Sequence, residues 1–155
     1  MKETVLVEGR LAYVQTRNIV TGNVIICFSF YGKSNVNREF ASSLITKLDN
    51  EIDNHNLENI IICGDFNFVT STNDRNTNKY SQSDNVYRSK WNILEIKHDL
   101  LDSFRKLNPT RRLYTFSQTG GNSRSRLDRI YFSSNIIGRV QKITFENNQE
   151  SKKKK

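Results

Sequence analysis

The chain has 155 residues, of which 35% are hydrophobic and 26% are charged, and its formal net charge is +8 at pH 7. This length suits one domain with a modest core rather than two domains. No apolar stretch approaches the roughly 18–20 residues that span a bilayer, and the apolar run at the N-terminus is too short for a signal peptide. We therefore expect a monomeric intracellular protein, nuclear or cytoplasmic, without a membrane partner.

The positive charge is concentrated at the C-terminal end. Lys152 to Lys155 supply four of the charges, which leaves +4 over the rest of the chain. This excess is compatible with a polyanionic partner such as DNA. Residues 147–155 are predicted to be a disordered lysine-rich tail, and a dedicated DNA-binding arm or a weak nuclear-import patch are the alternative interpretations.

The two cysteines, Cys27 and Cys63, each lie in an isoleucine-rich run of strand character. Such cysteines are usually buried free thiols that behave as small apolar groups. A disulfide between them is the alternative, which a reducing compartment disfavours. Two cysteines without neighbouring histidines do not form a zinc site.

Hydrophobic patterning in the first half of the chain predicts a strand–helix–strand unit. Residues 11–16 alternate apolar and polar side chains, as in a half-buried strand, whereas residues 24–31 form an almost continuous apolar run typical of a central strand covered on both faces. Apolar residues recur every four positions over residues 36–52, which predicts an amphipathic helix. Residues 60–63 then form the next buried strand of a layered α/β architecture.

The second half begins with a polar segment, residues 68–84, that we interpret as a long surface loop. Residues 85–107 predict two helices with a break near residues 97–99, and Pro109 ends the second. Three further strands are predicted, at residues 113–117, 126–133 and 140–145.

The end of the run at residues 60–63 carries the strongest chemical signal. Gly64 is followed by a carboxylate, Asp65, and two positions later by a carboxamide, Asn67. In an extended chain these two side chains point to the same side. A carboxylate that holds a water or a cation, beside an amide that orients it, suits phosphodiester hydrolysis. Taken alone, Gly-Asp is also a common strand-to-turn step.

Further blocks in order strengthen the first interpretation: Phe30-Tyr31-Gly32, Gly64-Asp65-Phe66-Asn67-Phe68-Val69, Asp102-Ser103-Phe104-Arg105-Lys106-Leu107-Asn108-Pro109, Tyr114-Thr115-Phe116 and Ser125-Arg126-Leu127-Asp128-Arg129-Ile130-Tyr131-Phe132-Ser133. Together they resemble the endonuclease/exonuclease/phosphatase superfamily, which has the DNase I-like fold. The closest branch looks like the endonuclease domain of non-LTR (long interspersed) retrotransposons. The Asp74-Arg75 pair favours that branch.

The resemblance implies an α/β (α+β) fold over residues 1–146. It would be a partial four-layer α-β-β-α sandwich of the DNase I-like type, lacking the first strands and the last strand. An incomplete first sheet would expose an apolar face and a new edge. The implied activity is Mg²⁺-dependent nicking of DNA by attack of water on a phosphodiester.

The resemblance also assigns catalytic roles. Tyr31 would lie against the scissile phosphate, although packing on the sheet is an equal alternative. Asp65 would position or deprotonate the attacking water, and Asn67 would hydrogen-bond the phosphate or that water. Asp128 matches the carboxylate that holds the catalytic histidine of the family. Asp65 and Asn67 are the candidate Mg²⁺ ligands.

Four residues are candidates for nucleic-acid binding: Lys33, Asn122, Arg124 and Arg126. The hairpin at residues 118–124 corresponds to one associated with target-DNA selection, and an ordinary solvated hairpin is the alternative. For Arg126, a structural pairing with an internal carboxylate is the favoured interpretation, and the nucleic-acid contact is its alternative. Phe116 is expected to pack.

The chain departs from the pattern of the family in two places. The upstream Asn and the principal metal-binding Glu are not matched, and we expect Glu3 and Glu8 to be poor substitutes because no strand is predicted to hold them. The closing Ser-Asp-His is not matched either, since His55 and His98 both precede Asp128. We therefore expect a crippled or inactive endonuclease; a weak non-catalytic nucleic-acid binder or a phosphatase of the same fold are the alternatives.

Overall fold

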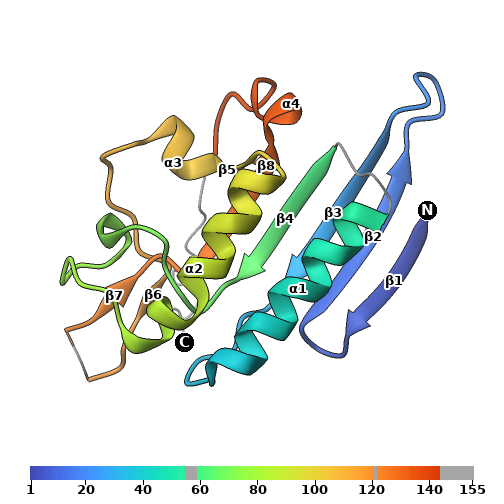
Figure 1. The fold of residues 1–155 in the computed structure, drawn as a ribbon. Helices are drawn as coiled ribbons and strands as arrows, with labels where there is room; N and C mark the ends of the chain where they lie inside the picture. Colours follow the sequence, from blue (N-terminus) through green and yellow to red (C-terminus); the bar gives the residue numbers. More distant parts are fainter. Residues whose placement is uncertain (55–58, 121, 144–155) are drawn as a thin grey trace, which may run out of the picture.

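A computed structural model describes residues 1–54, 59–120 and 122–143 of the chain. Its centre is a mixed six-stranded sheet in the order β1-β2-β3-β4-β8-β5, next to a two-stranded ribbon of β6 and β7 (Figure 1). The strands are β1 Lys2–Val7, β2 Leu11–Arg17, β3 Val24–Phe30, β4 Ile60–Asp65, β5 Leu100–Asp102, β6 Phe116–Ser117, β7 Arg124–Ser125 and β8 Asp128–Ser133. The helices are α1 Arg38–Asn54, the 3₁₀ turn η1 Thr72–Asp74, α2 Gln82–Lys97, α3 Ser103–Leu107 and α4 Ser134–Ile137.

Strand pairing sets the direction of every strand in the large sheet. β1, β2 and β3 form an antiparallel meander, and α1 then carries the chain across so that β4 runs parallel to β3. β8 is antiparallel to both β4 and β5. The parallel pair β3–β4 therefore ends at one edge of the sheet, which is also the edge at which β8 begins.

Helices α1 and α2 both cover the same face of the sheet (Figure 1). The amphipathic stripe predicted for α1 is confirmed, since Leu44, Leu48 and Ile52 are buried. The core under α2 is aromatic: the Trp91 ring contacts the rings of Phe30, Phe66, Phe68 and Tyr131. Burial of such large rings supplies most of the hydrophobic stabilisation of a small domain.

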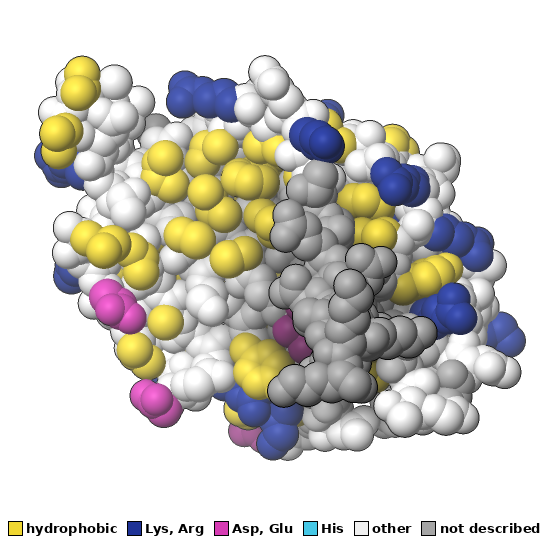
Figure 2. Space-filling model, turned by 180° about the vertical axis from the view of Figure 1, so that it is seen from behind, with side chains coloured by type: hydrophobic (Ala, Val, Ile, Leu, Met, Phe, Trp, Pro, Cys, Tyr) yellow, Lys and Arg dark blue, Asp and Glu magenta, His cyan; other side chains and the backbone are white. Residues whose placement is uncertain are grey.

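The opposite face of the sheet is apolar but only partly covered. Figure 2 shows hydrophobic side chains gathered on the side turned away from the helices. The residues of this back face alternate along each strand with core residues and are exposed or half-buried: Val5, Ala12, Val14, Ile25, Cys27, Ile61, Cys63, Ile130 and Phe132. The prediction that residues 24–31 are covered on both faces is wrong, because Ile25 remains 37% exposed.

The N-terminal segment differs from the sequence prediction. Lys2–Val7 pairs with β2 as strand β1, so a strand does precede residues 11–16. Glu3 lies on that strand and is exposed, and Glu8 lies in the turn that follows. The expectation that no strand holds Glu3 is therefore wrong. Short edge strands with charged residues carry a weak sequence signal.

The second half also contains corrections. Residues 100–102, predicted as helix, form β5, and the predicted strand at 113–117 is reduced to β6. The predicted strand at 140–145 is not formed by residues 140–143, and residues 144 onward lie outside the described part, as does the predicted tail. Residues 68–84 are no surface loop, because Phe68, Asp74 and Asp84 within them are buried. Tertiary pairing overrides local preference in these segments.

Candidate functional site

Four of the predicted site residues lie along one edge of the large sheet. Asp65 ends β4 and is the register partner of Asp128, the first residue of β8. Tyr31 directly follows β3, and the next residue, Gly32, donates its backbone N–H to the Asp65 carbonyl at 2.9 Å. The parallel β3–β4 pair and the antiparallel β4–β8 pair thus bring three distant segments together. We call this edge, formed by Tyr31, Asp65, Asn67 and Asp128, the rim.

The turn after β4 holds Asp65 and Asn67 by hydrogen bonds. Asp65 Oδ1 accepts the Asn67 backbone N–H at 3.0 Å, and Asn67 Nδ2 donates to the Gly32 carbonyl at 2.9 Å. Asn67 has a φ of 55°, so the chain is not extended there. The proximity of the two side chains was predicted, but the physical reason is a side-chain-stabilised turn rather than strand alternation.

Gly64 makes this turn sterically feasible. Its φ is 145°, and a Cβ atom at this position would lie 2.0 Å from the Phe30 carbonyl oxygen. Only glycine allows β3 and β4 to approach so closely at the point where Asp65 leaves the sheet.

The pKa of Asp65 is raised above the ordinary carboxyl value. Burial is the main cause, and the negative charge of Asp128 adds to it, while the Asn67 N–H and the Arg129 guanidinium act in the opposite direction. Arg129 is buried, stacks on the Phe66 ring at 4.2 Å and donates to the Phe68 carbonyl at 2.9 Å. The rim therefore combines opposed carboxylates with a fixed cation in the core behind them.

Tyr31 is 46% exposed, so its side chain is only partly covered by the sheet end that it follows. Its ring is covered by the guanidinium of Arg10, whose Cζ atom lies 4.4 Å from the ring centroid. The Tyr31 N–H donates to the Arg10 carbonyl at 2.8 Å. An open hollow beside this pair is lined by Glu8, Arg10, Ser29 and Tyr31, among others. Sequence reasoning missed Arg10, since only the β2–β3 pairing brings it to the rim.

Asp128 is exposed, and its backbone N–H donates to Thr115 Oγ1 at 3.1 Å. The Leu127 N–H donates to the same hydroxyl at 3.0 Å, so Thr115 fixes the start of β8. Of the two histidines, His98 ends α2 and its Nε2 lies 2.7 Å from Asp49 Oδ1, remote in sequence and element from the rim. His55 lies outside the described residues.

Three of the four predicted nucleic-acid-binding residues are on the surface. Lys33, Asn122 and Arg124 are exposed, and the latter two belong to the β6–β7 hairpin. Asn76 ties that hairpin to the domain, because its Oδ1 accepts the Arg124 N–H at 2.9 Å. Phe116 in the hairpin is 48% exposed, so its predicted packing role is wrong.

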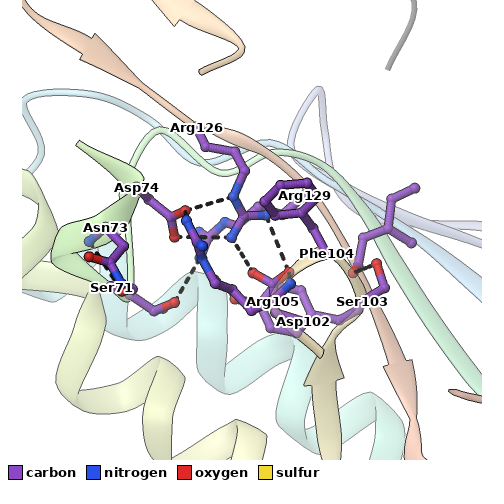
Figure 3. A network of polar contacts seen from close by, with 12 residues as sticks. Ser71, Asn73, Asp74, Asp102, Ser103, Phe104, Arg105, Arg126 and Arg129 are labelled. Atoms are coloured by element: carbon purple, nitrogen blue, oxygen red, sulfur yellow. Dashed lines mark hydrogen bonds and ion pairs between the residues drawn. The ribbon is translucent and has the colours of Figure 1, made fainter. Parts of the chain in front are cut away.

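Arg126 is the exception, because its side chain is fully buried. Its guanidinium binds Asp74 (Nε–Oδ1 2.8 Å) and Asp102 (Nη2–Oδ2 2.5 Å), and Arg105 also pairs with Asp74 (Figure 3). Burial alone would raise the pKa of Asp74, but the two arginines outweigh it and lower that pKa. The placement of Arg126 among the nucleic-acid-binding candidates is corrected: it has the favoured structural role, a pairing with internal carboxylates.

The rim fits a hard cation in part. Mg²⁺ is commonly held by one or two carboxylates together with water and substrate phosphate oxygens, and Asp65, Asn67 and Asp128 offer such oxygen atoms. A cation there would offset the repulsion between the two carboxylates. Elsewhere in the described residues, one group of three side chains could also hold a metal ion: Asp49, Asp53 and His98. Both aspartates of this group already form ion pairs with Lys97.

A mixed sheet with helices on one face, and acidic and amide side chains at the shared ends of its central strands, makes this an α/β protein and agrees with the DNase I-like fold predicted from the sequence. Comparison with family models gives the same assignment. Residues 34–145 match the model described as "Endonuclease/Exonuclease/phosphatase family". The chain belongs to this family.

Individual relatives support the assignment. The chain is 31% identical over 149 residues to the uncharacterized 149 kDa protein of transposon TX1 from Xenopus laevis, covering 93% of this chain and 11% of that protein. The AP endonuclease of Leishmania major superposes with a TM-score of 0.65 at 18% identity, covering 84% of this chain and 48% of that one. The endonuclease domain of TRAS1, a telomere-specific non-LTR retrotransposon, superposes with a TM-score of 0.59 at 17% identity. This match covers 83% of this chain and 52% of that one.

The chain therefore spans about half the length of these solved structures and a small part of the transposon protein. Within the described residues, no helix has both the length and the hydrophobicity needed to cross a bilayer.

Proposed function

We propose that the rim binds a phosphodiester group of DNA and that the chain derives from a Mg²⁺-dependent endonuclease of the retrotransposon type. The observation that carries this proposal is the pairing of Asp65 with Asp128 beside the anchored Asn67. Such a cluster of oxygen and amide groups can hold a cation, a water and a phosphate oxygen at one point. The relatives that are named as endonucleases support the nucleic-acid substrate.

Each rim residue has a chemical task in this proposal. Asp65 accepts a proton from the attacking water, and its raised pKa makes it a stronger base than an ordinary carboxylate. Asn67 orients that water or a phosphate oxygen. Tyr31 directs its phenol to a non-bridging phosphate oxygen, and the neighbouring Arg10 adds positive charge at the same place.

Asp65 and Asn67, beside Asp128, are the residues that would hold Mg²⁺. When bound, this ion neutralises charge on the phosphate and makes water more acidic. The Glu and His that the family resemblance requires are not matched in the 155 residues, so we propose weak metal binding and slow hydrolysis. Loss of a general acid–base group alone typically costs about 10²–10⁴-fold in rate.

The second candidate is a non-catalytic nucleic-acid binder. The net charge of +8 and the exposed Lys33 and Arg124 favour it. Binding of this kind depends on phosphate contacts and weakens steeply with salt. Non-catalytic binding is compatible with a rim that keeps the arrangement of the ancestral site but no longer catalyses hydrolysis.

A plasmid-nicking assay with Mg²⁺ separates the two candidates. We expect slow nicking that EDTA abolishes, that Asp65→Ala removes and that Asp99→Asn retains. Asp99 is a matched control because it is an exposed aspartate next to β5, at the end of the sheet opposite the rim. Equal, EDTA-insensitive background in all three proteins would refute the endonuclease proposal.

Fluorescence anisotropy with a labelled duplex tests the second candidate. Binding that weakens with salt, and that is reduced in a Lys33→Ala, Arg124→Ala double variant, would support it. If the duplex does not bind at low salt, both candidates fail.

A further inference from the structure

The back face of the large sheet has the dimensions of a protein interface. The sheet has six strands, and the five longer ones contain six or seven residues each. With strands about 4.8 Å apart and a rise of about 3.3 Å per residue, the sheet measures about 29 Å by about 20 Å, which is a flat area of about 600 Å². Two copies stacked on this face would bury about 1,200 Å² in total, which is the lower bound of the range for specific interfaces.

The distribution of charge on the back face disfavours a polyanionic partner. The strand residues that project from this face include no lysine or arginine, and the charged ones are acidic and lie at its margin: Glu3 on the edge strand β1, and Asp65 and Asp128 at the rim. The centre of the face, around Val14 and Ile61, is apolar. DNA and anionic lipid surfaces bind through basic residues. A partner of the back face must therefore present a flat apolar surface with little charge.

A second copy of the chain presents such a surface. Two sheets pack face to face about 10 Å apart, with their strands inclined by about 30°. A twofold axis that lies between the two sheets and runs across the strands makes the contact self-complementary. This rotation reverses the strand direction, so the rims of the two copies lie at opposite ends of the pair. The acidic side chains of Asp65 and Asp128 in one copy then do not face those of the other, and each rim stays open.

We propose that the chain forms a reversible twofold dimer in which the back faces of two copies pack against each other. Burial of apolar side chains drives the association. Because the buried area lies at the lower end of the range for specific interfaces, the dissociation constant is micromolar, and the back face is free at lower concentrations. This dimer differs from the monomer expected from the sequence, and it does not depend on the proposed function.

Sedimentation equilibrium of the reduced, full-length chain, from low micromolar to several hundred micromolar concentration, tests the proposal. We expect the mass to rise from 18.1 kDa toward twice that value. Ile25→Lys places a charge on the back face at a position that is 37% exposed. It should weaken dimerisation at least about tenfold, because an unpaired charge would be buried in the contact. Ile96→Lys, on the exposed side of α2, is the matched control and should dimerise like the unmodified chain.

Thiol labelling of the unmodified chain locates the contact. Cys27 and Cys63 are free thiols whose half-buried side chains lie on the back face, with their Sγ atoms 3.9 Å apart. Their rates of alkylation by N-ethylmaleimide should fall severalfold as the protein concentration rises, in parallel with the increase in mass. Urea unfolding curves show whether Ile25→Lys keeps the fold. If it does not, Val5→Lys on the edge strand β1 replaces it.

Four results would overturn the proposal. The first is a monomer at every concentration, and the second is a folded back-face lysine variant that dimerises like the unmodified chain. The third is a dimer whose cysteines are alkylated at a rate independent of concentration, because its contact would lie elsewhere. The fourth is equally slow alkylation at all concentrations, which would show that the back face is covered within a single copy.

Discussion

Asp65 and Asp128 are opposite each other in the β4–β8 register, so two carboxylates share one end of an antiparallel strand pair. Like charges opposite each other in a sheet are destabilising. The unfavourable pair is retained where β3, β4 and β8 meet at the rim, and the pKa of Asp65 is raised there. Repulsion between two neighbouring carboxylates lowers the stability of the fold, and such unfavourable pairs are typical of functional sites.

Asp128→Asn should lower the pKa of Asp65 toward the ordinary carboxyl value, because one cause of its elevation is the Asp128 charge. A raised pKa in the folded state means that stability is greatest below the ordinary carboxyl pKa and falls as pH rises through the raised value. The variant should therefore be more stable than the unmodified chain at pH 7, by less than about 1 kcal/mol for partly exposed charges. At about pH 3, where carboxyls are largely protonated, the difference should vanish. Carboxyl NMR titration and urea unfolding at both pH values measure these effects, and an unchanged Asp65 pKa would contradict the prediction.

Gly64→Ala should be strongly destabilising. The new Cβ would meet the Phe30 carbonyl oxygen at 2.0 Å, and the φ of 145° is unfavourable for any residue with a side chain. We expect a loss of about 3 kcal/mol or more in the free energy of unfolding. The control is Gly22→Ala, where φ is 73° but nothing lies within 4 Å of the added atom, so only the backbone penalty of about 1–2 kcal/mol remains. Urea denaturation compares them, and equal losses would show that the strand contact is unimportant.

Arg126→Met should destabilise the chain by about 3–5 kcal/mol at neutral pH, because it leaves buried carboxylates with incomplete compensation. Asp74, whose pKa is lowered, contributes stability that is present above the ordinary carboxyl pKa and is lost as pH falls through the lowered value. The penalty of the variant should therefore shrink under acid conditions, where the carboxyls take up protons. Arg112→Met, at an exposed arginine bonded to Asn78, is the control and should cost little. A penalty that does not change with pH would argue against this charge network.

The back face should bind hydrophobic dyes in the native state. Val5 is 56% exposed and Ile25 is 37% exposed on this face, where Figure 2 shows hydrophobic side chains gathered. Large apolar patches bind apolar ligands or promote association. Ile25→Thr should reduce fluorescence of bound anilinonaphthalene sulfonate and reduce light scattering, while the free energy of unfolding changes by less than about 1 kcal/mol at this partly exposed position. Ile93→Thr on the exposed side of α2 is the matched control. Equal dye binding by the unmodified chain and both variants would show that the dye does not bind at Ile25 on the back face.

Local sequence determined the elements with strong periodicity and the rim motif. The stripe of α1, strands β2 to β4 and the step from Gly64 to Asn67 could all be predicted, because each depends on side-chain alternation or on turn chemistry within a few residues. Family membership also followed from the ordered blocks, and it is shown by the match over residues 34–145.

Only the tertiary structure decided what depends on pairing between distant segments. It made residues 100–102 a strand, buried Arg126 between Asp74 and Asp102, stacked Arg10 on Tyr31, and set Cys27 beside Cys63. Each of these contacts joins residues that are far apart in the chain. The alternation of side chains along a strand shows which face a residue lies on, but it does not show which strand is the neighbour. The physical reason is that sheet register is fixed by packing of the whole layer against α1 and α2, which no short window of sequence contains.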